Sequence, residues 1–254
     1  MKHAALAAFR KRGYSVVETV PHDLDPDFLS LYEQCQPFTM STISRMYALH
    51  QATRYVVANG VPGAIVECGV WRGGSVMMAA MTMLQARVTD RDVYLFDTFE
   101  GQPPPSDRDV TFRGGRPTAK WRQATKHGVL DTTALPEELR AYAPIDDVRA
   151  NVYSTDYPRE RFMFVQGKVE ETLPDRAPEQ IAILRLDTDW YESTYHELQH
   201  LYHLVSDRGV IILDDYGFWQ GARTAVDQYF HEQDIQLLLH RIDDSGRMAI
   251  KTAR

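Results

Sequence analysis

Four aspartates close two apolar segments of this chain. Asp187 and Asp189 follow the first segment, and Asp214 and Asp215 follow the second. Neighbouring parallel strands lie roughly 4.8 Å apart, so carboxylates at matching strand ends can converge on one hard cation. Ligands of open α/β sheets bind outside these carboxyl ends. The spacing therefore predicts a site for Mg²⁺ or a similar ion.

The register of the four residues divides their possible roles. Asp187 and Asp189 project to the same side if the segment stays extended. Asp214 and Asp215 are adjacent, so both reach one cation only where the chain turns. Three carboxylates suffice for such a site and leave the fourth for another role. As an alternative, some of them cap the helices that follow, because Asp is favoured at helix N-caps.

A glycine-rich segment lies between a predicted strand and a predicted helix. Glu67–Ser75 reads E-C-G-V-W-R-G-G-S, which differs from the dinucleotide pattern G-x-G-x-x-G. Glu67, two residues before Gly69, suits an ammonium group better than a pyrophosphate. Asp97 closes the next strand, where a carboxylate can accept hydrogen bonds from ribose hydroxyls. The combination indicates a nucleoside without phosphates, S-adenosylmethionine above all, unless the glycines serve only tight packing.

An acidic metal site beside such a cofactor favours one reaction. A hydroxyl is a poor nucleophile until its proton is removed, and a divalent cation lowers the pKa of a hydroxyl that it binds. A nearby carboxylate can then take the proton. Alignment with the sulfonium methyl supplies further acceleration. These parts together predict metal-assisted O-methylation.

A zinc-protease signature also occurs, because His196–His200 reads H-E-x-x-H. On a helical wheel at roughly 100° per residue, His196, His200 and His203 point away from the apolar face. A zinc ion there would sit on an outer surface without a cleft. We therefore expect a solvated or subunit-contacting polar face.

Strands and helices alternate along most of the chain, which is typical of a doubly wound α/β sheet. We expect one Rossmann-like domain: a helical N-terminal cap or lid over residues 1–60, then a core over 61–254. A closing hairpin is expected at 236–239 and 248–251. The expected strands cover 64–68, 93–97, 161–166, 181–186 and 210–213, and the expected helices cover 43–57 (with Ser41 as N-cap), 76–84, 145–153, 191–205 and 221–231.

An insertion over about residues 102–143 interrupts this alternation. It contains three consecutive prolines and several cations around Trp121. Insertions of this length are functional lids or disordered loops in most compact domains. One hypothesis is that Arg113, Arg116 and Lys120 meet a charged or polyhydroxylated acceptor, and a solvated loop explains them equally well.

The overall charge argues against two classes of partner. The formal net charge of -7 predicts no bulk attraction to nucleic acid or to acidic membranes. Cys35 and Cys68 form neither a disulfide framework nor a CxxC metal pair. A signal peptide and a long apolar run are both missing from the sequence, so we expect a cytoplasmic protein. The exposed histidines and the aromatic content suit a homo-oligomer.

Four motifs resemble one family of enzymes. The similarity runs from about Pro37 to Phe230 in the correct order and spacing, and the chain resembles the macrocin/mycinamicin-type O-methyltransferases, which methylate deoxysugars of antibiotics. This resemblance implies a class I S-adenosylmethionine-dependent fold and Mg²⁺ dependence. The motifs are Val66–Ser75, Phe96–Gly101, Leu184–Asp189 and Ile212–Tyr216.

The resemblance also implies roles for individual residues. Asp187, Asp214 and Asp215 would be the metal ligands, and Asp189 would be the general base on the sugar hydroxyl. Cofactor binding would involve Thr39 and Met40 as a lid, Glu67 and Gly69 along the methionine portion, Ser75 near its carboxylate, Asp97 on the ribose, and Gly167, Lys168 and Val169 beside the adenine.

Two rival functions remain at this point. A catechol or phenol O-methyltransferase would keep the fold and bind two vicinal oxygens on the metal. A protein that binds S-adenosylmethionine without chemistry would have no need for Asp189 beside the metal. The sequence favours a small-molecule sugar or glycoside as acceptor.

Overall fold

The computed structural model of the chain describes residues 22–126 and 129–252. The part of the expected N-terminal cap before residue 22 therefore lies outside the described residues. Within them, a seven-stranded sheet has the order β5-β2-β1-β6-β7-β9-β8. The first five strands in this order pair in parallel, and β9 is antiparallel to both of its neighbours. The doubly wound fold with a closing antiparallel hairpin is confirmed.

The central strands are buried because helices cover both faces of the sheet. Every residue of β1 and of β6 is buried, as expected for parallel strands in the middle of such a sheet. The strands are β1 (Ala64–Cys68), β2 (Val93–Asp97), β5 (Phe162–Gln166), β6 (Ile181–Leu186), β7 (Val205–Leu213), β8 (His240–Arg241) and β9 (Arg247–Ile250).

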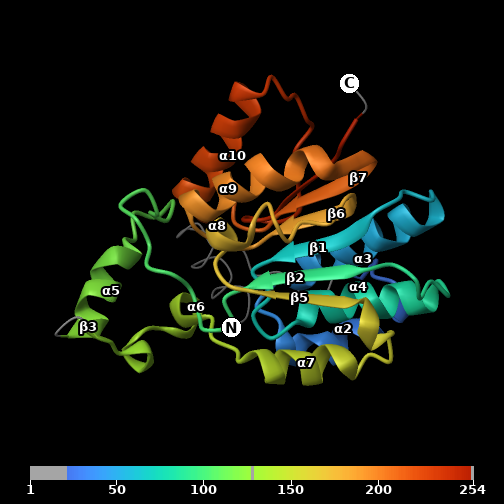
Figure 1. The fold of residues 1–254 in the computed structure, drawn as a ribbon, viewed down its shortest axis with the longest axis horizontal. Coiled ribbons are helices and arrows are strands. Elements are labelled where there is room, and N and C mark those ends of the chain that lie inside the picture. Colours follow the sequence, from blue (N-terminus) through green and yellow to red (C-terminus); the bar gives the residue numbers. More distant parts are fainter. Residues whose placement is uncertain (1–21, 127–128, 253–254) are drawn as a thin grey trace, which may run out of the picture.

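Two helical layers sandwich this sheet (Figure 1). One layer packs into the apolar cluster that includes Phe28, Met46 and Met78, and the other packs around Leu198 and Tyr229. The first layer contains α2 (Pro26–Cys35), α3 (Ile43–Ala58), α4 (Gly74–Gln85) and α7 (Ile145–Tyr153). The second contains α8 (Val169–Thr172), α9 (Tyr191–Leu201) and α10 (Gln220–Glu232).

Some predicted boundaries were wrong by a few residues. Helix α3 takes its N-cap from Thr42 rather than Ser41, and the Thr42 hydroxyl accepts the backbone N–H of Arg45. Strand β7 begins at Val205, five residues earlier than expected, because α9 ends in a short 3₁₀ turn over Tyr202–Leu204. The first strand of the hairpin is His240–Arg241 and not 236–239. Terminal residues of elements are the least determined by sequence pattern.

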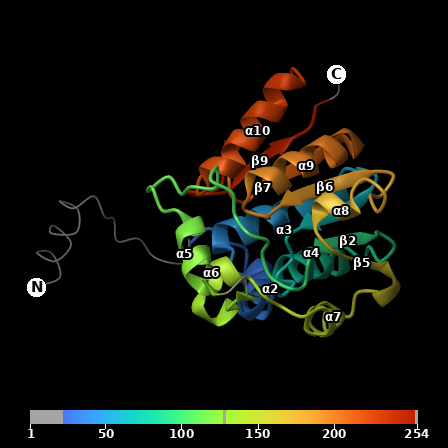
Figure 2. The same cartoon turned by 60° about the vertical axis from the view of Figure 1, so that its left-hand side comes forward.

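The insertion forms a small folded unit at one end of the sheet (Figures 1 and 2). It contains α5 (Pro117–Ala124), a short hairpin of β3 (Thr125–Lys126) and β4 (Val129–Leu130), a 3₁₀ turn over Thr132–Ala134, and α6 (Glu137–Arg140). An apolar cluster joins Trp121, Leu135 and Leu139 of this unit to Trp190 and Trp219 of the core. The insertion is therefore packed against the core.

Among the described residues, no helix combines the length and the apolar composition that crossing a membrane requires.

Candidate active site

A pocket of about 420 Å³ opens at the carboxyl edge of the parallel strands. The strand register places its walls side by side: Cys68 of β1 pairs with Leu186 of β6, which pairs with Leu213 of β7. Gly69, Asp187 and Asp214 therefore follow three adjacent strands at the same level, and all three line the pocket. This edge, between β1 and β6 where the strand order reverses, is the expected ligand position in such sheets.

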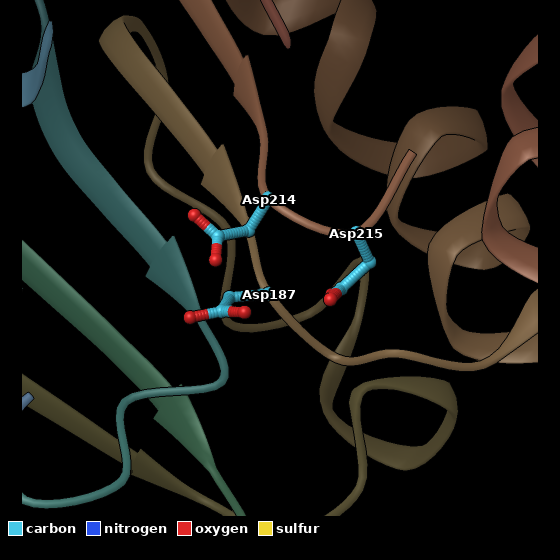
Figure 3. Close-up of side chains that lie close together, drawn as sticks. All are labelled: Asp187, Asp214 and Asp215. Atoms are coloured by element: carbon cyan, nitrogen blue, oxygen red, sulfur yellow. The ribbon is translucent and has the colours of Figure 1, made fainter. Parts of the chain in front are cut away.

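Three of the four aspartates form one cluster. One carboxylate oxygen from each of Asp187, Asp214 and Asp215 lies within 4.8 Å of the others. Figure 3 shows the three carboxyl groups gathered just beyond the ends of β6 and β7. A set of oxygen ligands at this spacing suits a hard divalent cation such as Mg²⁺. The residues present thus fit the predicted metal.

Two arginines lie against this cluster. Arg185 is buried, ion-pairs with Glu67, and contacts Asp187 and Asp214 at 2.8 Å each. Glu67 and Arg185 are register partners on neighbouring strands, which explains their pairing. Arg45 of α3 ion-pairs with Oδ2 of Asp214, while Arg185 binds Oδ1. The cations compensate part of the negative charge that the strand ends concentrate.

The compensation is incomplete. Burial raises the pKa of Asp187 well above its usual range, and repulsion from Asp214 and Asp215 adds to this although Arg185 opposes it. Burial likewise raises the pKa of Asp215, with repulsion from Asp189 as the next cause. A further positive charge among these buried carboxylates would stabilise their ionised form.

Asp189 lies beside the cluster and has separate partners. Its backbone N–H donates to Asp215 Oδ2 at 3.2 Å, while its carboxylate accepts hydrogen bonds from Trp219 Nε1 at 2.6 Å and from Gln102 Nε2. Burial, followed by repulsion from Asp187, raises the pKa of Asp189 to about 7. A carboxyl group with a pKa in this range is suited to accept a proton near neutral pH.

Asp189 does not reach this position in the way that the sequence suggested. Strand β6 ends at Leu186, and Asp189 has φ +65°, so the segment is no longer extended there. The turn, and not strand alternation, separates Asp189 from the ligand cluster.

The part of the pocket that follows the ends of β1 and β2 is shaped mainly by backbone groups. Asp97 accepts N–H groups from Val70 at 2.7 Å, from Trp71 at 3.0 Å and from Phe99 at 2.7 Å. It thereby joins the glycine-rich turn to the loop after β2. Gly69 has φ +83°, and a Cβ atom there would lie 2.0 Å from the backbone oxygen of Asp187. Only glycine allows the two strand ends to approach so closely.

Most of the predicted cofactor residues line this pocket: Met40, Gly69, Asp97, Gly167, Lys168 and Val169. Three others do not. Glu67 is buried beneath the pocket on Arg185, Ser75 is buried close to Met46, and Thr39 points its hydroxyl at the Met46 sulfur. The cofactor-binding roles of all nine residues stay predictions.

The structure does not support helix capping by the four aspartates or a zinc site at the H-E-x-x-H motif. Helices α9 and α10 have Trp190 and Trp219 at their N-caps, without a side-chain cap bond, so none of the four aspartates caps them. Among the described residues, the acidic cluster is the one group able to hold a metal. His196 and His200 are partly buried rather than fully solvated, and Glu197 is buried and accepts the Thr188 hydroxyl.

Sequence reasoning missed the residues that hold the site together. Arg45, Gln102 and Trp219 come from distant segments, and no local pattern marked them. Arg185 carried one available signal, because a cation inside a buried apolar strand requires an acidic partner. The cations of the insertion are exposed and are not among the residues that line the pocket: Arg108, Arg113, Arg116, Lys120 and Arg122. Their contact with an acceptor stays a hypothesis.

Comparisons with known proteins give the chain its relatives. Residues 34–249 match the family model described as macrocin O-methyltransferase. The chain is 36% identical over 208 residues to demethyldecarbamoylnovobiocin O-methyltransferase of Streptomyces niveus, covering 82% of this chain and 73% of that protein. It is 29% identical over 208 residues to mycinamicin III 3''-O-methyltransferase of Micromonospora griseorubida, covering 82% and 76%.

Solved structures agree with this result. The O-methyltransferase NovP superposes with a TM-score of 0.71 at 33% identity, covering 85% of this chain and 83% of that one. The calicheamicin methyltransferase CalS11 superposes with a TM-score of 0.58 at 18% identity, covering 96% of each chain, and supports the fold alone. The chain therefore belongs to the macrocin O-methyltransferase family and is a class I, S-adenosylmethionine-dependent O-methyltransferase.

Proposed function

We propose that the protein transfers a methyl group from S-adenosylmethionine to a sugar hydroxyl of a glycosylated small molecule. Mg²⁺ would be held by Asp187, Asp214 and Asp215, and Asp189 would act as general base. The observation that carries the proposal is the convergence of three carboxylates at 4.8 Å or less, with a fourth carboxylate beside them.

Two adjacent groups of pocket residues would serve the two reactants. Gly69 and Asp97 lie on one side, where a nucleoside cofactor is expected after β1 and β2. Asp187 and Asp189 lie on the other side, at the end of β6. An acceptor hydroxyl placed between them would meet the sulfonium methyl from one direction and a carboxylate from the other.

The chain's own residues would handle the proton and the charge. Asp189 would accept the hydroxyl proton as the oxygen–methyl bond forms and the sulfonium–methyl bond breaks, leaving a neutral thioether. Arg185 and Arg45 would hold the Asp214 carboxylate in place through their ion pairs. A bound divalent cation would fix the acceptor hydroxyl and lower its pKa.

The sugar acceptor rests on the relatives. Three of them are named as methyltransferases of a novobiocin derivative, of a rhamnosyl tetracenomycin and of mycinamicin III. Each name describes a natural product, and two of the names specify the methylated position with the primed numbers used for sugars. A glycoside is therefore the acceptor class to test first.

Turnover of labelled S-adenosylmethionine with a panel of glycosides and simple catechols tests the proposal. We expect methylated glycoside only, and loss of product when EDTA removes Mg²⁺. Asp189→Asn would lower turnover by about 10²–10⁴-fold without weakening cofactor binding. Asp227→Asn, a half-exposed residue on α10, is the control and would keep wild-type turnover.

Three results would contradict the proposal. Product from catechols but not from glycosides would favour the phenol methyltransferase. Undiminished turnover in EDTA would remove the metal, and undiminished turnover in Asp189→Asn would remove the base.

A further inference from the structure

Both carboxylate oxygens of Asp189 accept hydrogen bonds from side chains of other segments. Trp219 Nε1 donates to Oδ1 at 2.6 Å, and Gln102 Nε2 donates to Oδ2. Trp219 precedes α10, and Gln102 is the first residue of the insertion. Asp189 itself lies on a turn beyond β6, so its own segment does not fix the orientation of the carboxylate.

The indole of Trp219 is held in place by its surroundings. It is 5% exposed and meets the Trp190 ring edge-on, with the ring centroids 5.0 Å apart. Trp121, Leu135 and Leu139 of the insertion complete this apolar cluster. The insertion also bonds to the first residue of α10, since Gln220 donates its backbone N–H to Val110 O at 2.8 Å. The donor to Asp189 thus stands on a rigid support.

Gln102 is anchored through its neighbours. Its backbone N–H donates to Arg140 O at 3.3 Å, and the next carbonyl, of Pro103, accepts Trp190 Nε1 at 3.0 Å. Its side-chain oxygen is buried without a hydrogen-bond partner in the described part of the chain. The bond to Asp189 is therefore the contact that orients the amide.

These contacts give the insertion a function. We propose that Trp219 and Gln102 are positioning residues for Asp189, and that the insertion over residues 102–143 supports them by packing on the Trp190–Trp219 pair. The inference rests on the proposed role of Asp189 as general base. A base must be held within a fraction of an ångström of its productive geometry, and donors on rigid elements provide this.

Trp219→Phe removes the indole N–H and keeps an aromatic ring in the cluster. Hydrogen bonds to charged groups are stronger than those between neutral groups, so the loss of this one should loosen the position of Asp189. We expect kcat to fall by about tenfold or more, with KM for S-adenosylmethionine unchanged. In an Asp189→Asn background the same substitution would change the residual kcat by less than about twofold, because residues that act through one partner are not additive. Gln102→Met would show the same non-additivity.

Trp121→Phe is the matched control. Trp121 belongs to the same apolar cluster, and its Nε1 is buried with no hydrogen-bond partner in the described residues. Phenylalanine at this position keeps an aromatic ring packed on the Trp190–Trp219 pair and breaks no hydrogen bond of Asp189. We therefore expect kcat to fall much less than in Trp219→Phe, while both variants lose stability.

Two outcomes would overturn the inference alone. One is an equal fold-loss from Trp219→Phe in the wild-type and the Asp189→Asn backgrounds, where Asp189→Asn is itself impaired. The other is a loss from Trp121→Phe as large as that from Trp219→Phe. Wild-type turnover in Asp189→Asn alone would instead remove the proposed base, and the inference with it.

Discussion

The two sides of the pocket are built on different principles. The side at the ends of β1 and β2 is shaped by backbone: Gly69 allows close approach, and Asp97 binds three backbone N–H groups. The side at the ends of β6 and β7 is shaped by charge, with acidic groups balanced against Arg185 and Arg45. We therefore expect substitutions that add volume to be most harmful on the first side, and substitutions that change charge to be most harmful on the second.

Arg185→Met should show the largest effect, on the charged side. Glu67, Asp187 and Asp214 would lose their buried cation, and removing one partner of a buried ion pair costs about 3–5 kcal/mol. Urea unfolding measures this as a lower free energy of unfolding.

The exposed pair of Arg161 and Asp92 supplies the control for this measurement. Arg161→Gln breaks an ion pair whose side chains are more than a third exposed, so we expect a much smaller loss than in Arg185→Met, because water and salt screen exposed pairs. Equal losses in the two variants would mean that charge balance does not distinguish the acidic side.

Gly69→Ala tests the backbone-built side. The new Cβ would lie 2.0 Å from Asp187 O, at a residue with φ +83°. Strain and overpacking together should lower the free energy of unfolding by about 2–4 kcal/mol and abolish cofactor binding. Thermal unfolding and calorimetric titration with S-adenosylmethionine measure the two effects.

Gly114→Ala is matched to it, since Gly114 has φ +81° and a Cβ atom added there would meet nothing within 4 Å. This variant should lose only about 1 kcal/mol and bind the cofactor normally. If Gly69→Ala behaved in the same way, the close approach of the strand ends at Gly69 would not be required for stability or for cofactor binding.

Mg²⁺ should stabilise the acidic side even without an acceptor. The raised pKa values of Asp187 and Asp215 indicate that the cluster gains from added positive charge. At about 100 times Kd, a ligand specific for the folded state adds about 2.7 kcal/mol. Differential scanning fluorimetry in Mg²⁺ and in EDTA measures the shift. Asp215→Asn should reduce it, and an undiminished shift would place the ion elsewhere.

The smallest expected effect on stability comes from the titration of His50, a buried residue of α3. Burial lowers the pKa of His50, with Arg54 as a second cause and Asp25 and Asp27 in opposition. The folded state therefore keeps His50 neutral while the unfolded state binds a proton below its ordinary pKa near 6.5. Stability contributed by the neutral ring is complete above that pKa and declines as the pH falls.

His50→Asn keeps a neutral partner for Thr82, whose hydroxyl lies 2.9 Å from His50 Nδ1. Between about pH 7.5 and about pH 5.5 the wild type should lose stability faster than this variant, by less than about 1 kcal/mol in total. Parallel stability curves for the two proteins would show that another group carries the pH dependence.

The sequence determined the parts of the molecule that depend on local pattern. Apolar segments with β-branched residues predicted the central strands, and the glycines at 69, 73 and 74 predicted the turn after β1. The placement of Asp187 and Asp214 followed from the same rule, because parallel strands bring their carboxyl ends to one edge. The clustering of these two residues with Asp215 was thus foreseeable.

Tertiary structure decided how these groups are held. Arg45, Gln102 and Trp219 approach from segments 169, 87 and 30 residues away from their aspartate partners. Hydrogen bonds and ion pairs of this kind depend on the packing of whole elements, which no periodicity records. The insertion is the clearest case: composition predicted a lid or a loop, while burial of Trp121 against Trp190 and Trp219 made it part of the support for Asp189.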